Sequence, residues 1–181
     1  MIYDEELKIR SLTIYGFDVD SIDTNKIAYV PMNQYRIATY EHPVLYVDGL
    51  QCCIGLYAYG NNFGFAAHIN PKVIDNDNYE LNNNNIAIRC RRIDDLKNII
   101  LNEYHSIEPI KIGTAFGVNP LNEDYPTVRM IYDGIDELIE QLNKIGIKTE
   151  KLDRIYAPEF ILDTESNEII LSGKRQNQKT R

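Results

Sequence analysis

Residues 53–69 decide the fold of this chain, and they read Cys53-Ile54-Gly55-Leu56-Tyr57-Ala58-Tyr59, then Gly60-Asn61-Asn62, then Phe63-Gly64-Phe65-Ala66-Ala67-His68-Ile69. The two outer runs are apolar and rich in aromatic residues, as strands are. The Gly-Asn-Asn between them adopts positive backbone φ at little cost, which a tight hairpin turn requires. The pattern therefore predicts a β-hairpin in which the two runs lie antiparallel and side by side.

Further short apolar runs, separated by Asp, Asn, Pro and Gly, predict more strands on both sides of this hairpin. Before the hairpin they cover residues 12–15, 27–30, 36–40 and 44–47; after it they cover residues 86–90, 110–117, 147–149, 160–162 and 169–171. The polar, asparagine-rich stretch at 75–85 is predicted to be a surface loop. The chain is therefore rich in strands.

Two segments with helical spacing interrupt the strands. Residues 93–104 and 127–145 each carry one apolar stripe, and Gly146 is well placed to end the second helix. Because an amphipathic helix has to bury its stripe, we expect both helices to lie on a sheet. The predicted fold is α+β: a β-sandwich of mixed sheets with helices packed on its outer faces.

The composition is that of a globular protein, with 181 residues of which 44% are hydrophobic and 25% charged. We expect a single domain over residues 1–172, with a motif-bearing core at 36–171 and a basic, flexible tail at 173–181. The 19 basic and 27 acidic side chains give a net charge of −8. This charge disfavours nucleic acid and anionic membrane surfaces as partners, and no apolar run is long enough to span a bilayer.

Cysteine and histidine are few in this sequence. Cys52 and Cys53 are adjacent and Cys90 stands apart, which argues against a disulfide framework. Because the first residues also lack the features of a signal peptide, we expect a cytoplasmic protein. The chain has no glycine-rich phosphate loop and no metal-ligand spacing such as Cys-x-x-Cys or His-x-His. We therefore expect neither a metal nor a cofactor.

Cys53 and His68 stand on the two strands of the predicted hairpin, seven residues before the turn and six residues after it. Antiparallel pairing brings them near one another at the open end of the hairpin. An imidazole can take the proton of a neighbouring thiol, and the thiolate can then attack a carbonyl carbon. A buried cysteine that faces a core histidine is the structural alternative, and the spacing alone does not decide between the two.

The same residues resemble the nucleophile segment of the chemoreceptor glutamine deamidases (CheD). In that family a strand runs into Gly-Leu-Gly-Ser-Cys, followed by an apolar strand, a turn and Ala-His. Here Gly49-Leu50 matches the Gly-Leu, Cys53 falls on the nucleophile and Ala67-His68 matches the Ala-His. The order of elements is similar over residues 36–171. The wider superfamily of cysteine hydrolases, which includes the cytotoxic necrotizing factor toxins, shares the Cys/His pair.

The resemblance implies a cysteine-dependent amidohydrolase, most simply a deamidase of protein glutamine side chains. The family commonly has a threonine six residues before the nucleophile, which helps to orient the histidine. Val47 stands at that position here, so its backbone carbonyl would take this role, and Asp48 should point to the opposite face. Backbone amides at residues 51–53 would form the oxyanion hole. The family's Gly-Gly-x-x-Gly-Arg loop is replaced at residues 153–158 by Asp-Arg-Ile-Tyr-Ala-Pro.

Two other interpretations stand beside the amidohydrolase. A catalytically silent protein of the same fold would act in binding or scaffolding and would keep Cys53 and His68 by descent, since one fold hosts many activities. An unrelated structural α+β domain would carry the motif by coincidence. The amidohydrolase and the silent protein both require another protein, as substrate in the first case and as binding partner in the second.

Overall fold

The computed structural model describes residues 23–70, 88–89, 93–117 and 126–171. The helices in these ranges are the 3₁₀ helix η3 (Thr24–Lys26) and the α-helices α2 (Ile93–Glu103) and α3 (Pro126–Lys144). The strands are β1 (Ile27–Tyr29), β2 (Gln34–Ile37), β3 (Val44–Val47), β4 (Ile54–Gly60), β5 (Phe63–Ile69), β6 (Ile88–Arg89), β7 (Ile110–Phe116), β8 (Thr149–Lys151), β9 (Ile155–Tyr156), β10 (Phe160–Asp163) and β11 (Glu168–Leu171).

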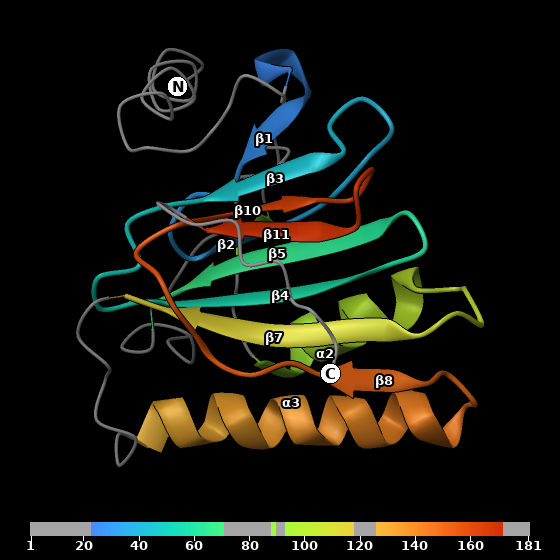
Figure 1. Ribbon diagram of the computed structural model, residues 1–181. Helices are drawn as coiled ribbons and strands as arrows, with labels where there is room; N and C mark the ends of the chain where they lie inside the picture. Colours follow the sequence, from blue (N-terminus) through green and yellow to red (C-terminus); the bar gives the residue numbers. More distant parts are fainter. Residues whose placement is uncertain (1–22, 71–87, 90–92, 118–125, 172–181) are drawn as a thin grey trace.

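The strands form two mixed sheets (Figure 1). In the smaller sheet the strand order is β1-β3-β10-β11, and β1 and β3 are its parallel pair. In the larger sheet the order is β6-β2-β5-β4-β7-β8, and β9 also pairs with β7. Neighbouring strands from β6 to β7 are antiparallel, whereas β8 and β9 both run parallel to β7.

The two sheets share an apolar layer, which is the interior of a sandwich. Leu45 and Val47 of β3 and Phe160 of β10 enter this layer from the smaller sheet, and Tyr57 of β4 enters it from the larger one. The other face of the larger sheet forms a second core with the buried stripes of α2 and α3. The predicted α+β fold, with mixed sheets and helices on the outside, is therefore confirmed (Figure 1). Both described α-helices lie on the larger sheet.

The predicted hairpin is also confirmed, and its turn is tighter than the sequence suggested. Gly60 pairs with Phe63 as the last rung of the β4–β5 ladder, so the turn consists of Asn61 and Asn62 alone. Their φ angles of 44° and 62° are those of the two central residues of a type I′ turn, whose twist matches that of the flanking strands.

Two predicted strands are displaced along the chain. The strand expected at residues 36–40 lies at Gln34–Ile37, because these residues pair with β5 directly after Asn33, whose φ is 61°. The strand expected at 147–149 begins at Thr149. Ile147 instead takes part in the C-terminal cap of α3. Its N–H donates to the carbonyl of Leu142, and Gly146 before it has a positive φ of 88°.

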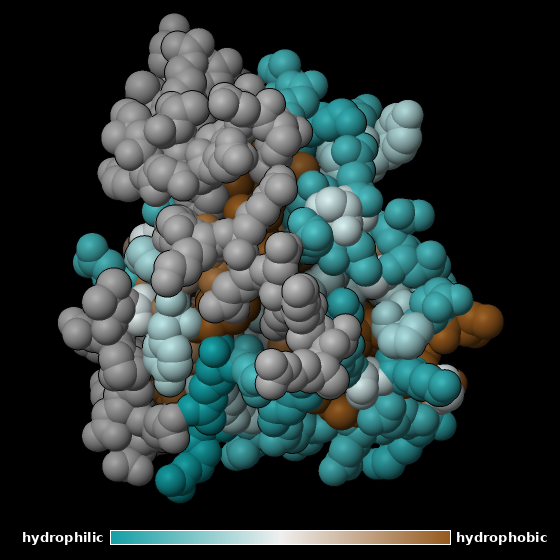
Figure 2. Space-filling view, viewed as in Figure 1, coloured by the Kyte–Doolittle hydropathy of each residue, from teal (hydrophilic) through white to brown (hydrophobic). Residues whose placement is uncertain are grey.

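The described surface on the face shown in Figure 2 is mostly hydrophilic. Large exposed apolar side chains in the described ranges stand far apart in the sequence, at Met32, Tyr40, Ile107, Ile145 and Tyr156. No described helix is long and apolar enough to cross a membrane. The predicted strand at 12–15, the loop at 75–85 and the tail at 173–181 lie outside the described residues.

Candidate active site

Cys53 and His68 lie on the same face of the larger sheet, at the open end of the β4–β5 hairpin. His68 pairs with Gly55 in β4 and with Gln34 in β2, and Cys53 directly precedes β4. Because side chains alternate along a strand, Cys53, Gly55 and His68 all point to one side. That side is the sandwich interior, where Cys53 belongs to the shared apolar layer.

The register makes Cys53 and His68 diagonal neighbours. Ile54 pairs with Ile69 and Gly55 with His68, so Cys53 lies two residues from the position directly opposite His68. Diagonal neighbours in a sheet have Cα atoms roughly 7–8 Å apart, with the side chains nearer to each other. The expected proximity of the two residues follows from this register, and a thiol–imidazole contact within about 4 Å stays a prediction.

The Cys53 thiol is covered by Met32, which lies in the turn between β1 and β2. The S–H donates to Met32 Sδ at 3.8 Å, and the side-chain amide of Asn70 also donates to Met32 Sδ, at 4.0 Å. Cys53 is only 2% exposed, whereas Met32 is 52% exposed. The thiol is therefore buried in the apolar layer, and among the described residues it also contacts the half-exposed side chain of Met32.

Burial raises the pKa of the Cys53 thiol to about 12, and the adjacent Cys52 thiol adds to the rise. Burial has this effect because an apolar environment disfavours the charged thiolate. In this conformation Cys53 is protonated at neutral pH and is a poor nucleophile. Cys52 is exposed.

A tight turn precedes Cys53 and lies against His68. Gly49 has a φ of 68°, and a Cβ built on it would lie 4.0 Å from Cε1 of the His68 ring. The N–H of Leu50 donates to the carbonyl of Pro158 at 2.9 Å, and the N–H of Cys53 donates to the carbonyl of Leu50 at 3.2 Å. The predicted oxyanion hole at residues 51–53 therefore loses the Cys53 amide, and the amides of Gln51 and Cys52 remain its candidates.

Gly117, the residue directly after β7, packs closely against the backbone of this turn. A Cβ on Gly117 would lie 2.2 Å from the carbonyl oxygen of Leu50 and 2.6 Å from Cα of Gln51. Only a residue without a side chain allows two backbone segments to approach this closely. Gly117 is thus a site-positioning residue that the hairpin pattern did not reveal.

Val47 and Asp48 lie at the end of β3, just before this turn. Val47 is fully buried in the sandwich layer and pairs with Phe160 of β10. Its backbone role toward His68 stays a prediction. Asp48 accepts a hydrogen bond from the Tyr29 hydroxyl at 2.7 Å. Because Tyr29 lies in the separate cluster on the outer face of the smaller sheet, Asp48 points away from the interior, as expected.

Sequence reasoning missed a buried polar pair on that outer face. The Tyr46 hydroxyl donates to Oε2 of Glu159 at 2.8 Å. Burial raises the pKa of Glu159 above its usual range, while the hydrogen bond from Tyr46 opposes that rise. The pair lies on the far side of β3 from Cys53, so it takes no direct part in this site.

Sequence reasoning also missed Met32 and Asn70. Alternation along β5 could have found Asn70, which stands two residues after His68. No local pattern marked Met32, because its contact with Cys53 joins residues 21 positions apart. Within the described ranges, no group of three or more His, Cys, Asp and Glu side chains could hold a metal ion.

Comparisons with known proteins give the site no external support. The chain matches no protein-family model, and no curated protein is found as a relative.

Proposed function

We propose that this protein is a CheD-like, cysteine-dependent amidohydrolase, most simply a deamidase of protein glutamine side chains. The observation that supports it best is the register of the β4–β5 hairpin, which puts Cys53 and His68 on one face at one end. The turn of Gly49 and Leu50 lies against both residues, as the resemblance to the deamidases requires.

In the proposed reaction His68 takes the proton of the Cys53 thiol, and the thiolate attacks the carboxamide carbon of a glutamine side chain. The negative oxygen of the tetrahedral intermediate accepts hydrogen bonds from the amides of Gln51 and Cys52. His68 then protonates the departing ammonia, which leaves a thioester on Cys53. Water, deprotonated by His68, hydrolyses the thioester to glutamate and restores the thiol.

This reaction requires the thiol to be uncovered first. With a pKa of about 12 the buried Cys53 is not a competent nucleophile. Met32 is half exposed and covers the thiol through side-chain contact. We propose that a bound substrate displaces Met32, which lets the substrate carboxamide reach Cys53 while His68 accepts the proton of the thiol. The substrate is a protein, no cofactor takes part, and the enzyme works in the cytoplasm, where thiols stay reduced.

The burial of Cys53 favours a second candidate, a catalytically silent protein of the same fold that acts in binding or scaffolding. A thiol that is 2% exposed, with its pKa raised by burial, is the expected state of a structural cysteine. In this case Met32 has only a packing role at the edge of the apolar layer. The two candidates differ in whether Cys53 reacts once Met32 is removed.

Ammonia release from casein, with mass spectrometry to locate new glutamates, tests the proposal. Wild type and Met32→Ala should release ammonia, and Cys53→Ser and His68→Ala should not. Cys52→Ala is the matched control, because it removes the adjacent exposed thiol and should keep the activity. Equal losses of ammonia release in Cys52→Ala and Cys53→Ser would mean that the assignment of Cys53 as the nucleophile is wrong. No release from either wild type or Met32→Ala would favour the silent protein.

A further inference from the structure

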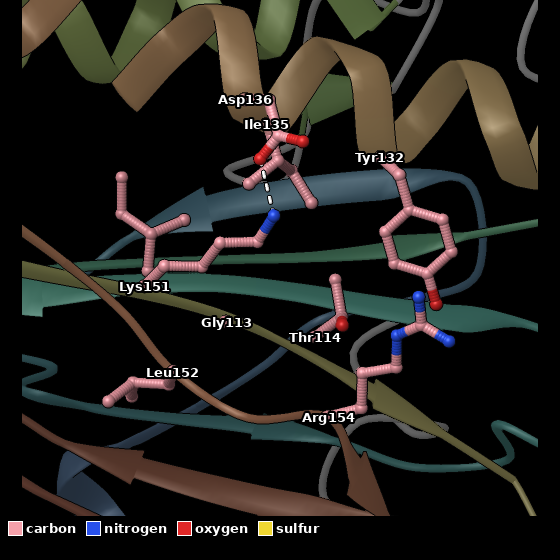
Figure 3. Close-up of a pocket in the computed structure, with 9 residues that line it drawn as sticks. Gly113, Thr114, Tyr132, Ile135, Asp136, Lys151, Leu152 and Arg154 are labelled. Atoms are coloured by element: carbon pink, nitrogen blue, oxygen red, sulfur yellow. Dashed lines mark hydrogen bonds and ion pairs between the residues drawn. The ribbon is translucent and has the colours of Figure 1, made fainter. Parts of the chain in front are cut away.

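A buried side-chain oxygen on β2, that of Gln34, has no hydrogen-bond donor among the described residues. It differs in this from the charged groups of the cavity between α3 and the edge of the larger sheet, which have partners (Figure 3). There Lys151 pairs with Asp136, and the Arg154 guanidinium lies 4.2 Å from the centre of the Tyr132 ring. A buried acceptor without a donor is unfavourable, because it has lost water and gained no partner. The oxygen of Gln34 therefore calls for an explanation.

Gln34 lies directly opposite His68. The register pairs His68 with Gln34 in β2 on one side and with Gly55 in β4 on the other. Directly opposite residues of antiparallel strands project from the same face, with Cβ atoms roughly 4.5–5.5 Å apart. Because Gly55 has no side chain, only Gln34 of these two neighbours can offer His68 a side-chain acceptor.

Cys53, His68 and Gln34 follow one another across three neighbouring strands. In the larger sheet β5 lies between β4 and β2. Cys53 belongs to the apolar layer of the sandwich, whereas Tyr35, the residue after Gln34, belongs to the core on the opposite face of the sheet. Since side chains alternate along a strand, Gln34 projects to the sandwich side with Cys53 and His68. His68 thus stands between the candidate nucleophile and the buried oxygen.

Backbone hydrogen bonds fix Gln34 beside β5. The Gln34 N–H donates to the carbonyl of Pro31 at 3.1 Å and closes the turn that carries Met32. Within this turn the Asn33 N–H donates to the carbonyl of His68 at 2.7 Å. The turn whose methionine contacts the candidate nucleophile therefore also sets the position of Gln34 relative to His68.

We propose that Gln34 is a positioning residue for His68, a role that rests on the function proposed above. When His68 has taken the proton of Cys53, both nitrogens of its ring carry an N–H. One N–H faces the thiolate, and the other donates to Oε1 of Gln34, which is a neutral acceptor. This hydrogen bond stabilises the protonated ring and fixes the orientation in which His68 returns the proton to the departing ammonia. Rotation of the Gln34 side chain closes it, as catalytic hydrogen bonds often tighten only during the reaction.

Alkylation of Cys53 by iodoacetamide at pH 7 tests this role, in a Met32→Ala, Cys52→Ala background that uncovers the thiol. Gln34→Met keeps the length of the side chain and removes the acceptor. It should slow alkylation about tenfold, the effect of losing one hydrogen bond to a charged group. Gln34→Glu returns an acceptor oxygen and should restore the rate. Gln141→Met makes the same change at an exposed glutamine of α3 and should leave the rate unaltered.

The same background separates a failure of this role from a failure of the proposed function. If His68→Ala slows alkylation but Gln34→Met reacts as fast as Gln141→Met, then His68 is the base and Gln34 does not position it. That result would favour the carbonyl of Val47, which no Gln34 variant alters. If His68→Ala leaves the rate unaltered, then the proposed function fails, and the role of Gln34 fails with it.

NMR of the wild-type chain gives a second test that needs no variant to fold. The pH is lowered until the ring signals of His68 show both nitrogens protonated. One ring N–H should then exchange slowly with water and show a nuclear Overhauser effect to the side chain of Gln34. Fast exchange of both ring N–H protons, or no Overhauser effect to Gln34, would overturn the proposal.

Discussion

Replacing Met32 by alanine should turn Cys53 from an inert thiol into a reactive one. The pKa of Cys53 is about 12, against an ordinary value of 9.0. At neutral pH a difference of about three pKa units lowers the thiolate fraction about a thousandfold. Since burial is the main cause and Met32 is the half-exposed side chain that contacts the thiol, Met32→Ala should raise the alkylation rate by about tenfold, and about a thousandfold is the upper bound.

The assay is alkylation by iodoacetamide at pH 7, with Cys53 followed by peptide mass spectrometry. A Cys52→Ala background removes the adjacent exposed thiol, so that modification of the peptide containing residue 53 reports Cys53 and is distinguished from that of Cys90. Asn70→Ala is the matched control, because it removes a second side-chain contact of Met32 and leaves Met32 itself in place. The alkylation rate of the wild-type thiol should rise about tenfold for each pH unit, as the thiolate fraction does below the pKa.

Two results would refute this reasoning. If Cys53 in the Met32-containing chain reacts as fast as a free cysteine, then burial does not suppress its thiolate. If Met32→Ala reacts no faster than Asn70→Ala, then Met32 is not the cover. A further comparison separates the two candidate functions: adding His68→Ala to Met32→Ala should slow alkylation if His68 is the base of Cys53, and should leave the rate unchanged in a silent protein.

Two further predictions concern stability. Gly117→Ala would place a Cβ 2.2 Å from the carbonyl oxygen of Leu50, so it should lower the free energy of unfolding by about 1–3 kcal/mol in urea denaturation; unchanged stability would show that the turn adjusts freely. The raised pKa of Glu159 means that the folded state binds its proton more tightly than the unfolded state. This contribution to stability should therefore fall as pH rises from the ordinary value of 4.5 through the raised pKa. Glu159→Gln should abolish that decline and still accept the hydrogen bond from Tyr46, and an unaltered pH profile would count against the buried carboxylate as its origin.

The sequence by itself determined most of the described strands, both α-helices and the central hairpin. Asn61 and Asn62 between two apolar runs specify a hairpin because few other residues adopt two successive positive φ angles cheaply. The single apolar stripe of residues 127–145 likewise requires a sheet beneath it. This hairpin puts Cys53 and His68 at the same end, while the register itself, with Gly60 opposite Phe63, came from the two-residue turn that the structure shows.

Tertiary packing alone decided the state of the candidate nucleophile. Whether a thiol is a nucleophile depends on its exposure and its neighbours, and Met32 comes from a turn that no local pattern connects to Cys53. The close approach of Gly117 to Leu50 is likewise set by tertiary packing and not by a local pattern. Hydrophobic periodicity reports which face of an element is buried, but not which distant side chain covers it, because burial is non-directional. The identity of the residue that touches a given thiol is fixed only when the sheets and turns come together.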